Sequence, residues 1–484
     1  MVIYQLTGRT KYIKNMKNEI ILMDASRIAE LIATRELSPV EVMRAHLSRI
    51  AEVNPKVNAI VALADGAMEA AKKAEAAVMS GEQVGPLHGV PFTAKDAIDA
   101  AGVLTQRGSP IFKGRVADAD ATVVARLKAA GGILIAKTNT PEFSYSIETD
   151  NLLTGRTNNP WNLDYTPGGS SGGESAAIAA GMSPLGLGSD LSISVRGPAA
   201  HTGIVGFKAT HGRVPLTGHW PRVPRRFWHI GPMARSVRDV ALAYSLLAGP
   251  DGADGFSTSP LAVDAGVGTA SNRPLRVGWL ASPGFFGPID PEVVATVKAA
   301  AQALSGAGCQ VEEVRLPLLE QTDGVSILWK LQEMESRPEF EKITAGHEAE
   351  VFRHVQLIFD TPETPLADFV SAEQTVERLR DSFADYFLRY DALLCPVTPF
   401  PATKHGLNDL VIDGQIVSPF HVMAATAPFS LTGLPALSMR FGTNHEGLPI
   451  GVQIVSSWLA ESTVLAVASR LEAVSLVRDQ HPIL

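Results

Sequence analysis

The segment with the clearest chemical potential is a glycine run at residues 166–175 that encloses two serines, Ser170 and Ser171. Glycine lets the backbone approach a ligand closely or adopt a positive φ. Taken alone, such a loop is typical of turns and anion-binding nests as well as of catalytic sites. A serine hydroxyl becomes a good nucleophile only when a neighbouring base takes its proton, so a catalytic role requires a base from elsewhere in the chain.

Two further segments supply charged side chains in apolar surroundings. Residues 186–198 are again rich in glycine and serine, and they contain Asp190 and Arg196. Upstream, Lys95 ends an apolar stretch, residues 90–94, that we expect to form a strand. A charge at that place needs a partner or a function, because burial of an unpaired charge is unfavourable.

Together these segments resemble the amidase signature family of serine hydrolases, and the resemblance covers nearly the whole chain from about Asp24. Further motifs that fit stand in the same order along the sequence: residues 159–162, 206–214, 231–237, 431–436 and 447–453. Chance does not produce so many ordered matches.

The resemblance implies a triad of Lys95, Ser170 and Ser194. Ser194 corresponds to the nucleophile, and Ser170 to the serine that follows a cis peptide bond, here after Gly169. The implied oxyanion hole consists of the backbone N–H groups of Leu191, Ser192, Ile193 and Ser194. The implied supporting residues are Gly169, Ser171, Asp190 and Arg196. We expect neither a metal nor a cofactor.

The implied chemistry needs these residue types. Lys95 is a base only when neutral, and desolvation on an apolar strand lowers the pKa of a lysine. Ser170 would relay the proton between Ser194 and Lys95 and later deliver it to the leaving amine. Backbone N–H donors would stabilise the tetrahedral oxyanion, by about 3–4 kcal/mol for each donor.

One departure from the family pattern lies directly before the nucleophile. The family usually has Gly-Gly there, and this chain has Ser192-Ile193. Backbone N–H groups do not depend on side chains, so we expect a narrower acyl pocket rather than a lost oxyanion hole. The tRNA-dependent amidotransferase subunits commonly keep Gly-Gly and have Gln-Pro-Ala after the arginine, where this chain has Gly197-Pro198-Ala199. A glutamine-hydrolysing amidotransferase subunit is therefore an alternative that this segment weakens.

Two other hydrolase classes fit less well. Residues 168–172 also match the G-x-S-x-G pattern of an α/β-hydrolase esterase, but that turn must follow an apolar strand, and residues 159–167 are polar. An esterase of that type needs a histidine, and we interpret His201 as a structural hydrogen-bonding group. His347 and His354 are seven residues apart, which favours a solvated helix over the H-E-x-x-H metal site.

A catalytically silent binding protein on the same scaffold is a further alternative. Loss of Lys95, Ser170 or Ser194 would have favoured it, and all three residues are present. A separate loop combines three arginines with aromatic residues, among them Phe227 and Trp228. We interpret this loop either as structural or as the substrate entrance, with Phe227 or Trp228 in contact with an apolar or aryl substrate.

Composition sets the broad class of the protein. The 484 residues include 42 Lys and Arg against 50 Asp and Glu, a net charge of −8, which argues against nucleic-acid binding by bulk charge. Hydrophobic residues make up 45%, too many for a disordered chain. The two cysteines, Cys309 and Cys395, are too few for a disulfide scaffold and are expected in the core. With no signal sequence or membrane span evident, we expect a cytoplasmic enzyme without a membrane partner, for which a homodimer is one open oligomeric state.

Alternating apolar strands and helices predict an α/β fold with a large mixed central sheet covered by helices on both faces. Residues 38–41 form a capping-box pattern, and Asp290-Pro291 begins a second helix. We expect residues 1–23 to be a poorly ordered leader and residues 24–484 to be one amidase signature domain. Within it, residues 85–240 would be the catalytic core and residues 251–425 a variable region that shapes the substrate pocket. Residues 251–274 are expected to be a surface connection and residues 333–385 solvated helices.

The predicted function is hydrolysis of carboxylic amides through a serine acyl-enzyme. Apolar or aryl amides are the preferred substrate class, with esters and carbamates (urethanes) as further small-molecule substrates.

Overall fold

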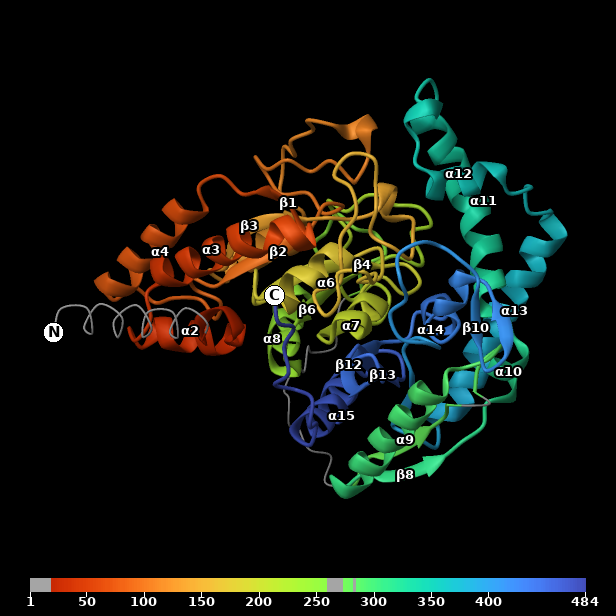
Figure 1. Ribbon diagram of the computed structural model, residues 1–484. Coiled ribbons are helices and arrows are strands. Elements are labelled where there is room, and N and C mark those ends of the chain that lie inside the picture. Colours follow the sequence, from red (N-terminus) through yellow and green to blue (C-terminus); the bar gives the residue numbers. More distant parts are fainter. Residues whose placement is uncertain (1–18, 259–272, 282–283) are drawn as a thin grey trace.

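The strand predicted before Lys95 forms β2 (Pro91–Lys95), and its apolar neighbour forms β3 (Ile133–Thr138); every residue of both strands is buried. They belong to a mixed sheet in the computed structural model, which describes residues 19–258, 273–281 and 284–484 (Figure 1). Within these residues the sheet has eleven strands in the order β1-β3-β2-β4-β6-β5-β12-β13-β9-β7-β8. The predicted large mixed α/β sheet is confirmed.

The remaining strands are β1 (Ile60–Leu63), β4 (Leu185–Asp190), β5 (Val205–Lys208), β6 (His229–Ala234), β7 (Arg276–Trp279), β8 (Gln310–Glu313), β9 (Ala392–Pro396), β10 (Leu410–Ile412), β11 (Gln415–Val417), β12 (Ala436–Thr443) and β13 (Pro449–Ser456). Strand β2 runs parallel to β3 and β4, and β7 runs parallel to β8 and β9. The neighbours β4 and β6, β6 and β5, β5 and β12, and β12 and β13 are antiparallel. Strands β10 and β11 form a separate hairpin.

The α-helices are α2 (Ala25–Ala33), α3 (Pro39–Val57), α4 (Ala67–Ser80), α5 (Thr122–Ala129), α6 (Gly172–Ala179), α7 (Arg196–Thr202), α8 (Val237–Leu247), α9 (Pro291–Gly306), α10 (Pro317–Gln321), α11 (Gly324–Thr344), α12 (Arg353–Asp360), α13 (Leu366–Phe387), α14 (Ala427–Leu431) and α15 (Glu461–Ala473). Short 3-10 turns are η1 (Pro110–Phe112), η2 (Glu142–Ser144), η3 (Glu348–Glu350) and η4 (Pro419–Met423).

Successive residues of β5 show that helices cover both faces of the sheet. A Cβ placed on Gly206 would lie 2.9 Å from the Cβ of Ala199 in α7. The next residue, Phe207, instead packs its ring edge-on against Tyr244 of α8, with 5.2 Å between ring centroids. Because neighbouring residues of a strand point to opposite faces, α7 and α8 lie on opposite sides of the sheet.

Local signals predicted the start of two helices correctly. Ser38 accepts hydrogen bonds from the backbone of Val40 and Glu41, and the Glu41 carboxylate accepts from the Ser38 N–H, which completes the predicted capping box at the start of α3. The Asp290 side chain accepts from the Glu292 N–H at the start of α9. Both cysteines are buried, as expected.

Parts of two predicted segments lie outside the described residues. Of the expected leader, residues 19–22 are helical, and Ile20 and Ile21 are buried in the main apolar cluster; residues 1–18 lie outside the described part. Of the expected surface connection, residues 259–272 lie outside it as well.

Residues 333–385 fold mainly as α11, α12 and α13, which lie together on one side of the molecule (Figure 1). The prediction of solvated helices is wrong for their inner faces: Phe340, His354 and Leu379 are buried. Their charged residues cover only the outward faces, which is why composition alone suggested solvation.

Candidate active site

The site is built at the carboxyl end of β2, where Lys95 is fully buried. Because β2 and β4 run parallel, their carboxyl ends lie at the same edge of the sheet. The Lys95 Nζ lies 2.6 Å from the Ser170 Oγ and 3.1 Å from the Oγ of Ser189, which is on β4. Lys137 of β3 donates from Nζ to the Lys95 carbonyl oxygen at 2.9 Å and so fixes the end of the strand. No sequence pattern had indicated a role for Ser189.

Burial determines the protonation of this lysine. It lowers the pKa of Lys95 well below its usual value, against the opposing charges of Asp190 and Glu174. Burial also raises the pKa of Glu174 to about 7, against hydrogen bonds from Thr93 and Thr138. Because Glu174 is then only partly ionised near neutral pH, its charge raises the pKa of Lys95 less than a full carboxylate charge would. The site therefore favours a neutral amine, which is the form that a base requires.

The glycine run holds Ser170 against its neighbours. The Gly169–Ser170 peptide bond is cis, and the Ser170 carbonyl oxygen accepts from the Thr140 Oγ1 at 3.1 Å. A Cβ on Gly169 would lie 2.6 Å from the Glu148 nitrogen, and one on Gly173 would lie 2.4 Å from the Asn139 carbonyl oxygen. At both positions glycine lets the backbone segments pack against one another without a side chain between them.

Ser194 lies in the loop between β4 and α7. Its carbonyl oxygen accepts from the Ser171 N–H at 3.3 Å, which joins the two serine-rich segments. Ser171 also exchanges two hydrogen bonds of 3.2 Å with Ser189, one in each direction. In the described parts of the chain no residue hydrogen-bonds to the Ser194 Oγ, and Ser194 lines a cavity. Its hydroxyl is thus available to a bound molecule.

The predicted oxyanion loop presents unused backbone donors. No described residue accepts a hydrogen bond from the N–H of Leu191, Ser192, Ile193 or Ser194. The Ser192 carbonyl accepts from the Arg196 Nη2 at 2.8 Å, and the Ile193 carbonyl accepts from the Gly197 N–H at 2.7 Å. A trans peptide points its C=O and N–H in opposite directions, so the N–H groups of Ile193 and Ser194 point away from these two donors.

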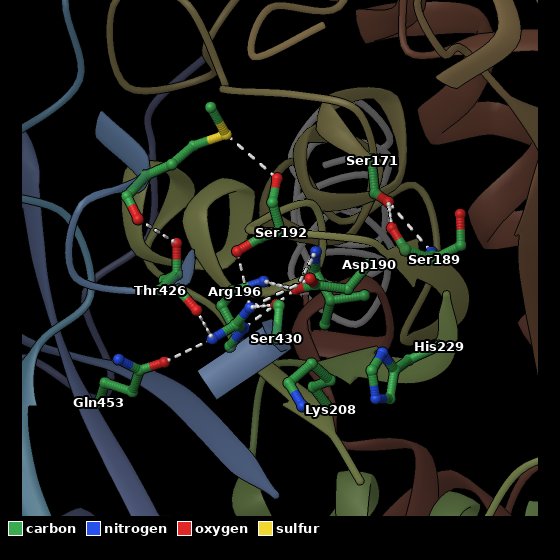
Figure 2. A network of polar contacts seen from close by, with 12 residues as sticks. Ser171, Ser189, Asp190, Ser192, Arg196, Lys208, His229, Thr426, Ser430 and Gln453 are labelled. Carbon is green, nitrogen blue, oxygen red and sulfur yellow. Dashed lines mark hydrogen bonds and ion pairs between the residues drawn. The ribbon is translucent and has the colours of Figure 1, made fainter. Parts of the chain in front are cut away.

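Asp190 and Arg196 form a fully buried ion pair beneath this loop (Figure 2). The Arg196 Nε lies 3.0 Å from one Asp190 oxygen, and its Nη2 lies 3.1 Å from the other. Asp190 also accepts from the Val195 N–H at 3.1 Å. Burial alone would raise the pKa of Asp190, but the Arg196 guanidinium beside it holds that pKa below its ordinary value.

The same guanidinium reaches the carboxyl-terminal part of the chain (Figure 2). It donates to the Thr426 carbonyl oxygen at 3.2 Å, the Ser430 Oγ at 2.7 Å and the Gln453 Oε1 at 2.9 Å. Sequence reasoning missed these three partners; the only signal was that Gln453 belongs to one of the family motifs. They connect the loop before Ser194 to α14 and β13.

A narrow cavity of about 50 Å³ opens at Ser194. Its walls come from the predicted oxyanion loop, the end of η2 and the segment after it, the helices α11 and α12, and η4. A larger groove of about 870 Å³ adjoins it. Val325, Trp329 and Phe420 line both spaces, with 6.0 Å between the centroids of the two rings. Residues from the expected variable region, 251–425, thus line both the cavity and the groove.

The two aromatic candidates lie in different surroundings. Trp228 is 1% exposed and lines the cavity with Ser194. Phe227 is also buried, but its ring lies under the Arg226 guanidinium, 4.6 Å from centroid to Cζ, and it is not among the residues that line the cavity. His201, expected to be a structural hydrogen-bonding group, has no partner for either ring nitrogen among the described residues.

Metal-binding clusters and membrane-spanning helices are both absent from the described residues. In residues 19–258, 273–281 and 284–484 no three His, Cys, Asp or Glu side chains are grouped so that they could hold a metal ion. In the same residues no helix is both long and apolar enough to cross a membrane.

Known proteins match along most of the chain, and the family model described as Amidase matches residues 41–465. The chain belongs to the amidase signature family. A glutamyl-tRNA(Gln) amidotransferase subunit from Symbiobacterium thermophilum is 37% identical over 96% of this chain and 99% of its own length. An acylamidase from Rhodococcus erythropolis is 34% identical over 95% of this chain and 97% of its own.

A solved structure gives the same answer for the fold. The crystal structure of a bacterial aryl acylamidase of the amidase signature family has a TM-score of 0.84 and 28% identity, covering 93% of this chain and 96% of that one. The resemblance predicted from the motifs, and the fold it implied, are confirmed. The chain is thus an amidase signature hydrolase.

Proposed function

We propose that the protein hydrolyses small apolar or aryl amides through an acyl-enzyme on Ser194. The observation that carries the proposal is the 2.6 Å contact between the buried Lys95 Nζ and the Ser170 Oγ, next to a loop whose Ser194 hydroxyl faces a cavity. The acylamidase relative and the aryl acylamidase neighbour support the choice of substrate class.

The proposed first half-reaction transfers the acyl group to the enzyme. The Ser194 Oγ attacks the carbonyl carbon while its proton passes to the Ser170 Oγ, whose own proton passes to the Lys95 Nζ. The oxyanion binds to the free N–H groups of the loop, a contribution of about 3–4 kcal/mol for each donor. When the tetrahedral intermediate collapses, the C–N bond breaks, and the amine leaves with the proton returned from Lys95 through Ser170.

The second half-reaction restores the enzyme. Water loses a proton by the same relay and attacks the Ser194 ester; the C–Oγ bond breaks, the acid leaves, and Ser194 regains its proton. Esters and carbamates pass through the same kind of tetrahedral intermediate, so we propose them as secondary substrates. Trp228 would contact the substrate, since it lines the cavity.

The runner-up function is that of an amidotransferase subunit, which the name of a 37% identical relative favours. Against it, a Cβ on Gly197 would lie 2.5 Å from the Cγ1 of Ile193, so the glutamine common at that position does not fit beside this isoleucine. Glutamine hydrolysis that appeared only with added partner subunits would favour the runner-up.

The test of the proposed function is hydrolysis of a panel of anilides, aliphatic amides, esters and carbamates by the wild-type protein and Ser194→Ala. We expect Ser194→Ala to lose at least about 10⁴-fold in rate, while mass spectrometry of the wild type detects an acyl adduct on Ser194. Ser245→Ala, a change on the exposed side of α8, is the matched control. A fully active Ser194→Ala protein would refute the nucleophile assignment.

A further inference from the structure

His354 is an unpartnered polar side chain in the wall of the Ser194 cavity. It belongs to α12, is 4% exposed and lines the cavity together with Ser194 and Gln332. Neither of its ring nitrogens has a hydrogen-bond partner among the described residues. Burial of a polar group without a hydrogen-bond partner is unfavourable, so such a group in a native protein calls for an explanation.

Hydrogen bonds and ring packing at the start of α12 hold His354 in place. The Phe352 N–H, just before α12, donates to the Glu142 Oε2 at 2.6 Å, and the other Glu142 oxygen accepts from the Ser109 Oγ at 2.6 Å. The Phe352 ring packs edge-on against the imidazole, with 4.8 Å between centroids. The start of α12 is therefore anchored to the segment that carries η2, beside the site.

The protonation of the ring defines what it can bind. Burial, with a smaller contribution from the Arg353 charge, lowers the pKa of His354 to about 4. At neutral pH the imidazole is uncharged and offers one N–H donor and one acceptor nitrogen. None of the described residues that line the cavity carries a charged side chain to pair with a charged ligand group, whereas a hydroxyl or carbonyl would satisfy one ring nitrogen.

Other buried histidines differ from His354 in their surroundings. His46, His219 and His229 each use one ring nitrogen in a contact to a backbone carbonyl oxygen. His201 also lacks partners among the described residues, but a Cβ placed on Gly168 would lie 3.1 Å from its Nδ1, and His201 does not line the cavity. Of these five histidines, His354 is the one that shares its cavity with the proposed nucleophile.

We propose that His354 and Gln332 recognise an uncharged hydrogen-bonding group of the substrate within the Ser194 cavity. Gln332 comes from α11, so two helices supply polar groups to a wall that is otherwise mainly apolar. The proposal rests on the proposed function and narrows its substrate class from apolar amides to amides with a second, neutral polar group. His354 would thus be a specificity residue rather than part of the proton relay.

The experiment uses two matched pairs of anilides, one with and without a hydroxyl on the ring, the other with and without a hydroxyl on the acyl chain. We expect the wild type to prefer the hydroxylated member of one pair by about tenfold or more in kcat/KM, chiefly through KM. His354→Leu should remove that preference, so that both members of the pair have similar kcat/KM values. His354→Gln should restore part of it, and His347→Leu, an exposed change before α12, should leave it unchanged.

Binding to Ser194→Ala separates this proposal from the proposed function. Calorimetry with the same anilides needs no turnover, so a preference that disappears in Ser194→Ala/His354→Leu supports recognition even if no anilide is hydrolysed. Should the His354 variants fail to fold, Ser194→Ala/Gln332→Leu makes the same measurement. Equal affinity for both members of both pairs in Ser194→Ala, or a preference unaffected by the His354 and Gln332 changes, would overturn the proposal.

Discussion

The Arg196 Nη2 donates to the Ser192 carbonyl oxygen at 2.8 Å, and this contact orients the peptide whose other end is the Ile193 N–H. The orientation of the loop peptide is thus set by the Arg196 side chain, which does not itself line the cavity. The same guanidinium pairs with Asp190 and reaches Gln453, so one side chain couples the proposed oxyanion loop to β4 and β13 of the sheet.

Arg196→Lys tests that coupling. A lysine keeps the charge but cannot reach all these acceptors, and breaking a buried ion pair costs about 3–5 kcal/mol. We expect a lower unfolding temperature and a kcat reduced more than KM is raised. Arg27→Met, which removes an exposed ion pair with Glu30, is the control and should leave the unfolding temperature close to that of the wild type. An Arg196→Lys protein with wild-type stability and kcat would contradict the role given to this contact.

The pH dependence of activity should report Lys95. Its pKa is lowered by burial, and the base works only when neutral. The specificity constant kcat/KM should therefore reach its maximum above that lowered pKa and fall as the pH drops through it. Lys95→Ala should be slower by orders of magnitude and recover in part at high pH, where hydroxide replaces the base. An unchanged acid limb in Lys95→Ala would show that another group titrates.

The same lysine should affect stability with a defined sign. The unfolded chain keeps Lys95 protonated up to about pH 10.4, whereas the folded protein releases that proton at lower pH. Between these two pKa values the wild type loses stability as the pH falls. Lys95→Met lacks this loss, so its unfolding temperature should rise relative to the wild type as the pH is lowered from about 10 to about 7. A constant difference across that range would contradict the shifted pKa.

Ile193 and Gly197 should behave as a coupled pair. A Cβ at residue 197 would lie 2.5 Å and 2.8 Å from the Ile193 Cγ1 and Cδ1, and Ile193 packs in a buried cluster with Phe400 and Met423. Gly197→Ala should cost about 1–3 kcal/mol through overpacking, and much less in an Ile193→Ala background. Thermal or urea unfolding of the four proteins measures the coupling; additive effects would show that the two residues are independent.

Substitution of the neighbours Phe227 and Trp228 should have different effects, one on stability and the other on substrate binding. Trp228 lines the cavity, so Trp228→Ala should raise KM for aryl amides. Phe227 packs under Arg226 away from it, so Phe227→Ala should lower stability by about 3–5 kcal/mol and leave the KM of the folded enzyme near the wild-type value. Initial rates at a temperature where both variants are folded distinguish the two outcomes.

Much of the part of the fold that holds the candidate site was predictable because its sequence signals are local. The apolar run before Lys95 predicted β2, and the capping box predicted the start of α3. The motifs that surround Ser170 and Ser194 carried the resemblance to the family, which supplied the proposed site residues.

What was missed depends on contacts between distant segments. Nothing in the residues near His354 shows that α12 folds over the cavity, and its charged neighbours suggested a solvated helix instead. The partners of Arg196 at Thr426 and Ser430 lie more than two hundred residues away in the sequence, so no local pattern identifies them. Ser189 was hidden for a different reason, since a serine on a buried strand gives no sign of the lysine beside it.

The position of β12 and β13 in the sheet has a consequence for folding during synthesis of the chain. These late strands lie between β5 and β9 in the middle of the sheet, and β13 carries Gln453. As the chain emerges from the ribosome, one edge of β5 therefore stays unpaired until nearly the whole protein has been made. Over the same period Arg196 lacks its acceptors in the carboxyl-terminal part of the chain. Nascent fragments should accordingly be inactive and prone to association, and activity should arise only when the final strands close the gap.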